Sequence, residues 1–272
     1  MNLFYKKLQS KEKYKEKYIG ENDLYLEIYE QNNKSGTDGK KPPLLFLHGA
    51  WSGSWMWHKY IPHFVNAGFK CYVMNLRSHY KGRSQDITRI NFNDYVDDLN
   101  LIIDECEYPP IVIGHSIGAL IAQKSAEKKH LSGLVSVDTT ECKEINAIIS
   151  CLEEVMYTSD VIIPPRIKLD DYQDRTAEDI KIMEKYFSIE SGLALRECAV
   201  KPGISVNRDL VNCPGLVIKA INNPNDDKIG IVTRQYFNAD YVGFENITHT
   251  GLLIGKRHLE VVQSILQWID RL

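Results

Sequence analysis

The stretch from residue 109 to residue 123, PPIVIGHSIGALIAQ, constrains the fold more than any other part of the sequence. Its first half is a short β-branched run typical of a buried strand, and its second half has a helical pattern. Between them lies a Gly-x-Ser-x-Gly turn, Gly114-His115-Ser116-Ile117-Gly118. Glycine at both ends of this turn lets the strand and helix backbones approach closely, so the Ser116 hydroxyl projects from a sharp bend. We therefore predict a nucleophilic serine at the carboxyl end of a parallel strand.

The same alternation of apolar runs and helical patterns extends along most of the chain. A hairpin is expected over residues 13–31, and the C-terminal pattern is a strongly amphipathic helix. Alternating strands and helices indicate βαβ units, so the predicted fold is α/β, with a mostly parallel central sheet flanked by helices. The predicted buried strands are 43–49, 70–76, 111–114, 131–138 and 215–221, and the predicted helices are 92–106, 117–129 and 256–272.

Residues 141–212 interrupt this rhythm. They contain helical patterns at 144–157, 177–188 and 191–199 and no convincing strand. Thr176 and Asp179 have the spacing of a capping box at the start of the second helix. We predict that residues 141–212 form a helical cap inserted between two strands, while residues 1–140 and 213–272 form the α/β core.

A nucleophilic serine needs a base within hydrogen-bonding reach. His130 lies 14 residues after Ser116 near the end of the same helix, about 21 Å away along its axis, which is too far. His258 falls within the C-terminal helix, where a solvated role is expected. His249 follows the run ADYVGFENIT, which has the pattern of a final strand, and precedes Thr250-Gly251. We therefore predict that His249 is the base.

The base in turn needs a carboxylate to fix its tautomer. The segment after the strand at 215–221 reads NNPNDDKIG and offers Asp227, with Asp226 as the alternative. Asn223 lies nearer the end of that strand, and Asp138 ends the strand at 131–138 and is another residue that could orient the base. We favour Asp227, and the choice among these residues stays open.

Attack of a nucleophilic serine on a carbonyl group produces an oxyanion, and two backbone N–H groups are expected to bind it. One belongs to Ile117, at the positive end of the helix that follows Ser116. The other is expected in the loop His48-Gly49-Ala50-Trp51, where Ala50 is the best candidate. Trp51 and His115, which neighbour the donor and the nucleophile, are candidates for contact with the substrate.

Composition excludes several classes of function. With 33 Lys and Arg against 36 Asp and Glu, the net charge is −3, which gives no electrostatic basis for binding nucleic acid or an anionic membrane. The basic N-terminus lacks the apolar core of a signal peptide. The six cysteines form neither a Cys-x-x-Cys pair nor a Cys/His metal spacing, so we expect reduced thiols, no metal and a cytoplasmic location. The expected partner is a small-molecule substrate, and the chain is expected to be a monomer or a homodimer.

Three segments resemble the α/β-hydrolase superfamily: LLFLHGAWSGSW, GHSIGA, and ITHTG followed by the last helix. The segment NLRSHYKGRS is similar to the Asp-x-Arg-Gly-His-Gly-x-Ser loop of that family, with Asn75 and Ser78 in place of Asp and Gly. HGAWSGSWMWHKYIP is similar to a subgroup of plant methyl-ester esterases and hydroxynitrile lyases, and to small bacterial esterases. Thr250 stands where hydroxynitrile lyases carry Lys, and Ser116 disfavours family members with an Asp nucleophile.

This resemblance implies an α/β-hydrolase fold, a triad of Ser116, His249 and an acid, an oxyanion hole at Ala50 and Ile117, a helical cap and no cofactor. The expected activity is that of a serine hydrolase, which cleaves a carboxylic ester or thioester of a small, apolar substrate through an acyl-enzyme. Two alternatives stay open. One is acyl transfer, or lactone or C–C bond hydrolysis, in a biosynthetic pathway. The other is a catalytically weak protein that binds a ligand on the same fold.

Overall fold

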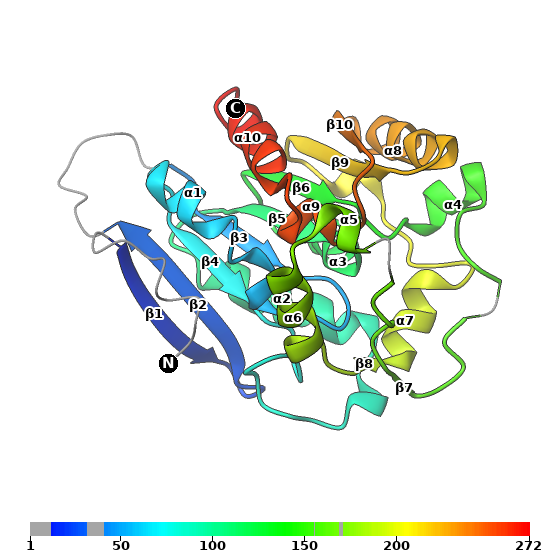
Figure 1. Cartoon of the computed structure of the whole chain (residues 1–272), viewed down its shortest axis with the longest axis horizontal. Coiled ribbons are helices and arrows are strands. Elements are labelled where there is room, and N and C mark those ends of the chain that lie inside the picture. Colours follow the sequence, from blue (N-terminus) through cyan, green and yellow to red (C-terminus); the bar gives the residue numbers. More distant parts are fainter. Residues whose placement is uncertain (1–11, 32–40, 155, 169–170) are drawn as a thin grey trace.

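The computed structural model describes residues 12–31, 41–154, 156–168 and 171–272, and is built around an eight-stranded sheet (Figure 1). The strand order is β1-β2-β4-β3-β5-β6-β9-β10. All neighbouring strands from β4 to β10 pair in parallel, whereas β1 pairs with β2, and β2 with β4, in antiparallel fashion. The predicted α/β fold with a mostly parallel sheet is thus confirmed. Residues 1–11 of the predicted core lie outside the described residues.

The strands of the sheet follow the apolar runs of the sequence. The central strands are buried on both faces, as parallel strands between two helical layers must be. Their bounds are β1 (Glu12–Ile19), β2 (Leu24–Gln31), β3 (Leu44–Leu47), β4 (Cys71–Met74), β5 (Ile111–His115), β6 (Gly133–Val137), β9 (Gly215–Ile221) and β10 (Asp240–Glu245).

Two hydrophobic clusters cover the two faces of the sheet. In β3, Leu44 and Phe46 contribute to one cluster and Leu45 and Leu47 to the other, because successive side chains of a strand point to opposite faces. The first cluster includes side chains of α1 (Ile61–Asn66), α9 (Gly251–Ile254) and α10 (His258–Ile269). The second includes side chains of α2 (Phe92–Asp104) and α3 (Ile117–Ser125). The carboxyl ends of the central strands are thereby held between two helical layers.

The described residues of the insertion, 141–212, add no strand to the main sheet, and its elements extend from α4 and α7 at the right of Figure 1 to α5 and α6 near the middle (green to yellow). The capping box of Thr176 and Asp179 is present, as expected. The expectation that the insertion contains no strand is wrong, because β7 pairs with β8 in antiparallel fashion. Two-residue strands are too short to show a period of two, so sequence periodicity does not reveal them. The bounds are α4 (Lys143–Ile149), β7 (Val161–Ile162), α5 (Asp171–Asp174), α6 (Ala177–Tyr186), β8 (Glu190–Ser191) and α7 (Gly192–Ala199).

Helix α8 (Pro224–Phe237) is the main element that the sequence patterns did not reveal. It begins where the sequence suggested a loop. Asn223 is its N-cap and forms a capping box with Asp226, while Pro224 occupies the first turn. The apolar periodicity of α8 is too weak to predict the rest of the helix, although the capping residues and Pro224 mark its start clearly.

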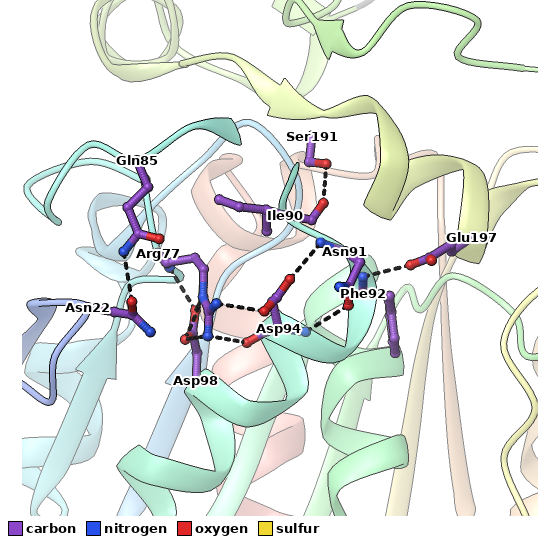
Figure 2. A network of polar contacts seen from close by, with 10 residues as sticks. All are labelled: Asn22, Arg77, Gln85, Ile90, Asn91, Phe92, Asp94, Asp98, Ser191 and Glu197. Carbon is purple, nitrogen blue, oxygen red and sulfur yellow. Dashed lines mark hydrogen bonds and ion pairs between the residues drawn. The ribbon is translucent and has the colours of Figure 1, made fainter. Parts of the chain in front are cut away.

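The segment after β4 is tied to α2 through one arginine (Figure 2). Arg77 donates from Nε and Nη2 to Asp98 at 2.9 and 2.6 Å, and from Nη1 to Asp94 at 2.8 Å. Ser78 stands where the similar family loop has glycine and adopts a φ of 63°, in the left-handed region. Asn75, which replaces the family's aspartate, is buried and accepts a hydrogen bond from the Ser54 backbone at 2.8 Å. The loop of this chain therefore accommodates both residues.

Figure 2 also shows two bonds between the insertion and the start of α2. Ser191 donates from Oγ to the Ile90 carbonyl at 2.5 Å, and Glu197 accepts from the Phe92 backbone N–H at 2.8 Å. The insertion is consequently bonded to the core through residues other than those at its two ends.

Among the helices of the described residues, none combines the length and the apolar character needed to cross a bilayer. All six cysteines are free thiols.

Candidate active site

Ser116 lies at the bend between β5 and α3 with φ 56° and ψ −127°. This backbone conformation is strained for a residue with a side chain, and such strain is common at functional sites. Ile117 is the first residue of α3, so its N–H belongs to the helix turn that has no intrahelical acceptor. The predicted strand–turn–helix arrangement is present.

Close backbone packing holds the loop after β3 against this bend. A Cβ atom on Gly49 would lie 2.9 Å from the Cβ of Ser116, and one on Gly118 would lie 2.3 Å from the carbonyl oxygen of His48. Only glycine fits at either position without displacing backbone. Ala50 follows Gly49 directly, so the packing of Gly49 against Ser116 brings the loop that carries Ala50 close to the bend before Ile117. Ala50 and Ile117 are the two residues predicted to bind an oxyanion.

His48 supports this loop rather than joining the reaction. Its Nε2 accepts from the Leu76 N–H at 3.1 Å, and its Nδ1 therefore carries the proton and donates to the Gly49 carbonyl at 2.8 Å. Burial lowers the pKa of His48 to about 3, so the ring is neutral at physiological pH.

His249, the predicted base, packs against His115, the residue before Ser116, with ring centroids 4.3 Å apart. Its Nδ1 is 2.5 Å from Oδ2 of Asp138, the residue that directly follows β6. The Ser116 N–H donates to the Val137 carbonyl at 3.0 Å, and the Thr140 N–H donates to the Ser116 carbonyl at 3.2 Å. The backbone of Ser116 is thus bonded to residues on either side of Asp138, so Ser116, Asp138 and its partner His249 lie near the carboxyl ends of the neighbouring strands β5 and β6.

The carboxylate beside His249 is therefore Asp138 and not the predicted Asp227 or Asp226. Asp226 is the N3 residue of the α8 capping box and accepts from the Asn222 and Asn223 N–H groups. Asp227 accepts from the Tyr241 hydroxyl at 2.7 Å. A helix that starts at Pro224 uses both carboxylates locally, and Asn223 is its N-cap. The sequence feature that could have identified Asp138 is that it directly follows its strand, β6. The carboxyl end of β6 lies next to that of β5, which Ser116 follows.

Asp138 is a buried carboxylate that contacts two groups, the His249 ring and the Lys219 ammonium. Its side chain is 8% exposed, and Lys219 Nζ lies 2.9 Å from the oxygen that His249 does not use. Although burial opposes ionisation, His249 and Lys219 hold the pKa of Asp138 well below its usual range. An ionised Asp138 requires the proton of His249 on Nδ1, which leaves Nε2 free to accept a proton.

His115, a predicted substrate contact, is only 2% exposed and packs under the base. The rings of His115 and His249 have centroids 4.3 Å apart, and Nε2 of His115 donates to the His249 carbonyl at 3.1 Å. Burial, with His249 beside it, holds the pKa of His115 well below its usual range, so this ring is neutral. Its position corrects the prediction: His115 supports His249 and is buried from substrate.

Two residues of the insertion hold the loop that carries His249. Asp174 accepts from the Thr248 N–H at 2.5 Å, and Arg175 donates from Nη2 to the hydroxyls of Thr248 at 2.6 Å and of Thr250. A Cβ on Gly251 would overlap the Asp174 carboxylate at 1.9 Å, so glycine is needed there. Both chain neighbours of His249 are therefore fixed from the insertion.

The insertion also holds the loop that carries Ala50. Trp51 has φ 62°, its N–H donates to Oε2 of Glu190 at 3.3 Å, and its carbonyl accepts from the Ser188 N–H at 2.9 Å. The Trp51 ring is partly exposed, with its centroid 6.3 Å from that of Tyr157. A partly exposed indole next to Ala50 is in the position expected for a substrate contact.

Glu190 is fully buried in a network of polar groups behind Trp51. It accepts from His79 Nε2 at 3.0 Å and from the Tyr95 hydroxyl at 2.5 Å. Burial opposes charge on both groups of the His79–Glu190 pair, yet each favours the charged form of the other. The pKa of His79 is raised and that of Glu190 is lowered.

Asp174, Arg175, Glu190 and Lys219 were not among the residues predicted from sequence. Three of them lie in the insertion, where the sequence carries no motif. For Lys219, the signal was a lone charge inside the apolar run GLVIKAI. Within the described parts of the chain, no group of His, Cys, Asp and Glu side chains is arranged to hold a metal ion.

The fold and this site define the class of protein. Residues 44–188, more than half of the chain, match the model of the alpha/beta hydrolase family, and the chain belongs to this family. Among curated proteins, none matches the sequence significantly.

Solved structures with the same fold are remote in sequence. A carboxylesterase structure from the thaumarchaeon Nitrososphaera gargenis is 15% identical, with a TM-score of 0.65, and the match covers 94% of this chain and 99% of that one. MenH from S. aureus is 16% identical, with a TM-score of 0.66 and coverage of 90% and 98%. The thioesterase domain of the curacin biosynthetic pathway is 14% identical, with a TM-score of 0.61 and coverage of 96% and 100%. At these identities the likeness shows the shared fold alone.

Proposed function

We propose that this protein is a serine hydrolase that cleaves a carboxylic ester or thioester through an acyl-enzyme. The observation that carries the proposal is the hydrogen bond of 2.5 Å between His249 Nδ1 and Asp138 Oδ2, at the strand end beside Ser116. It supports Asp138 as the acid that the sequence left open, and it leaves the outer nitrogen of His249 free to act as a base.

In the proposed reaction, His249 Nε2 takes the proton of Ser116 Oγ as this oxygen attacks the acyl carbonyl. The oxyanion that forms is held by the N–H groups of Ala50 and Ile117. His249 then gives its proton to the leaving alkoxide or thiolate, and the ester on Ser116 remains. Water, deprotonated by His249, attacks this ester, and Ser116 recovers its proton when the acid is released.

We infer that the acyl group is small and apolar, because Trp51 and Tyr157 lie next to the proposed oxyanion site and are partly exposed. The similar structures include a carboxylesterase and a thioesterase domain, which agrees with either leaving group. Apolar side chains at this point favour an apolar acyl group.

The test is labelling by a fluorophosphonate probe, which reacts with an activated serine. The wild-type protein should be labelled, and Ser116→Ala and His249→Ala should not be, although both remain folded by circular dichroism. A panel of p-nitrophenyl esters and acyl thioesters of increasing chain length then measures kcat/KM. Wild-type ester turnover by Ser116→Ala would contradict the proposal, and products formed with an added alcohol in place of water would identify an acyltransferase instead.

A further inference from the structure

Behind the carboxylate of Asp138 lies a second, buried layer of charge. Lys219 on β9 forms ion pairs with Asp138 Oδ1 at 2.9 Å and with Glu141 Oε1 at 3.2 Å. The three side chains are only 12%, 8% and 11% exposed, respectively. The two oxygens of Asp138 are thus divided, with one on His249 and the other on Lys219.

The sheet register places Lys219 at this point. Ile218 pairs with Val137, and the Asp138 N–H donates to the Ile218 carbonyl at 2.7 Å. The residue that follows Ile218 therefore faces the residue that follows Val137. A lysine in the middle of an apolar parallel strand is costly unless it is paired, so its presence requires the two carboxylates.

The charges of this cluster do not cancel. When all three groups are ionised, Asp138 and Glu141 carry two negative charges and Lys219 carries one positive charge, which leaves one net negative charge beside the His249 ring. Although burial opposes its charge, the two carboxylates raise the pKa of Lys219, so it stays protonated at physiological pH. Burial raises the pKa of Glu141, so this carboxylate is the member of the cluster that takes up a proton most readily.

We propose that Lys219 and Glu141 are positioning residues that act on His249 through Asp138. Lys219 fixes the carboxylate by the oxygen that His249 does not use, and the opposite charges of Lys219 and Glu141 set how strongly the site stabilises the His249 imidazolium. The catalytic consequence rests on the proposed function, but the protonation of His249 can be measured without any turnover.

Other titratable groups contact the loop of His249, pack against its ring or lie near its partners Asp138 and Lys219. From the insertion, Asp174 and Arg175 carry opposite charges and contact the same loop. From β10, Tyr241 is neutral because burial and Asp227 raise its pKa. From β5, the His115 ring is neutral. These groups are unchanged in the variants below, so differences between the variants report on Lys219 and Glu141.

The experiment is an NMR titration of the His249 ring in a Ser116→Ala background. Glu141→Gln removes a negative charge, so His249 should release its proton at a pH lower by about one unit. Adding Lys219→Met removes a positive charge and should move the titration back up by about one unit. The second step is made in the Glu141→Gln background because, without Lys219, Glu141 and Asp138 would share a proton and mask the effect. Asp227→Asn is the matched control and should leave the titration in place.

In the enzyme with Ser116 intact, the acidic limb of the pH–rate profile should move in the same two directions, and Lys219→Arg should restore the wild-type limb. A purely structural role for Lys219 would lower kcat without opposite shifts. Equal titrations of His249 in all folded variants would overturn the proposal. If the double variant does not fold, Glu141→Gln alone decides by the presence or absence of its downward shift. Absence of turnover in the wild type would refute the proposed function and leave the NMR result valid.

Discussion

Replacing Asp138 by asparagine tests whether this carboxylate, which contacts His249, is the acid, rather than Asp227 or Asp226, which the sequence favoured. Asp138 has φ 45°, and asparagine is among the few residues that adopt this left-handed conformation without much strain. The variant keeps the shape of the side chain but can donate from Nδ2 to His249 Nδ1. That bond places the proton of His249 on Nε2, where the ring cannot accept one from Ser116.

The size of the effect follows from the contact distance. Unit charges 2.5 Å apart attract each other by about 7 kcal/mol at an effective dielectric constant of about 20. The His249 side chain is 47% exposed and its charge is spread over the ring, so we discount the lost attraction to about 4–5 kcal/mol. This corresponds to a decrease of about 10³–10⁴ in kcat/KM.

The assay is steady-state hydrolysis of a short p-nitrophenyl ester, with thermal unfolding to verify the fold. Asp227→Asn is the control, because that carboxylate contacts Tyr241 and the start of α8. Its loss should change kcat/KM by less than about twofold, since only a helix-terminal charge is removed. The reasoning is refuted if Asp138→Asn keeps a tenth of the wild-type kcat/KM, or if Asp227→Asn is the variant that loses activity.

Three further outcomes are expected. Gly118→Ala should lower the free energy of unfolding by about 1–3 kcal/mol in urea titrations, because its Cβ would lie 2.3 Å from a backbone oxygen; an unchanged midpoint would contradict this. Burial lowers the pKa of His48 to about 3, that of His58 to about 4 and that of His115 well below its usual range, so these rings are neutral when folded and protonate on unfolding. Stability should therefore fall as the pH drops below about 6.5, by about 1.4 kcal/mol per pH unit for each ring, and His58→Gln should reduce that slope. Glu190→Gln should cost about 3–5 kcal/mol of stability, because its fully buried carboxylate pairs with an imidazole; a Tm equal to that of the wild type would argue against the pair.

The features that could be predicted best from the sequence are those whose residues are consecutive in the chain. The position of Ser116 at a sharp bend could be predicted because a strand, a glycine-flanked turn and a helix follow one another within fifteen residues. His249 followed from elimination, because few histidines come after Ser116 and only one ends a strand pattern. Their separation of 133 residues does not matter, since parallel strands bring their carboxyl ends to one edge.

The acid could not be fixed in the same way. Asp138 and Asp227 both follow strands, and choosing between them requires knowing that α8 begins at Pro224 and uses Asp226 in its capping box. The contacts from the insertion were beyond sequence reasoning for a different reason. Arg175 and Thr250 are brought together only by the folded chain, and neither residue type in isolation indicates such a pairing.

The contacts of the insertion with the loops that carry Ala50 and His249 have a consequence for how the insertion can move. Glu190 and Ser188 hold the peptide next to Ala50, and Asp174 and Arg175 hold the neighbours of His249. If the insertion moved away as one rigid piece, the contacts with both loops would break at the same time. Any movement of the insertion that leaves both loops in place must therefore spare these contacts.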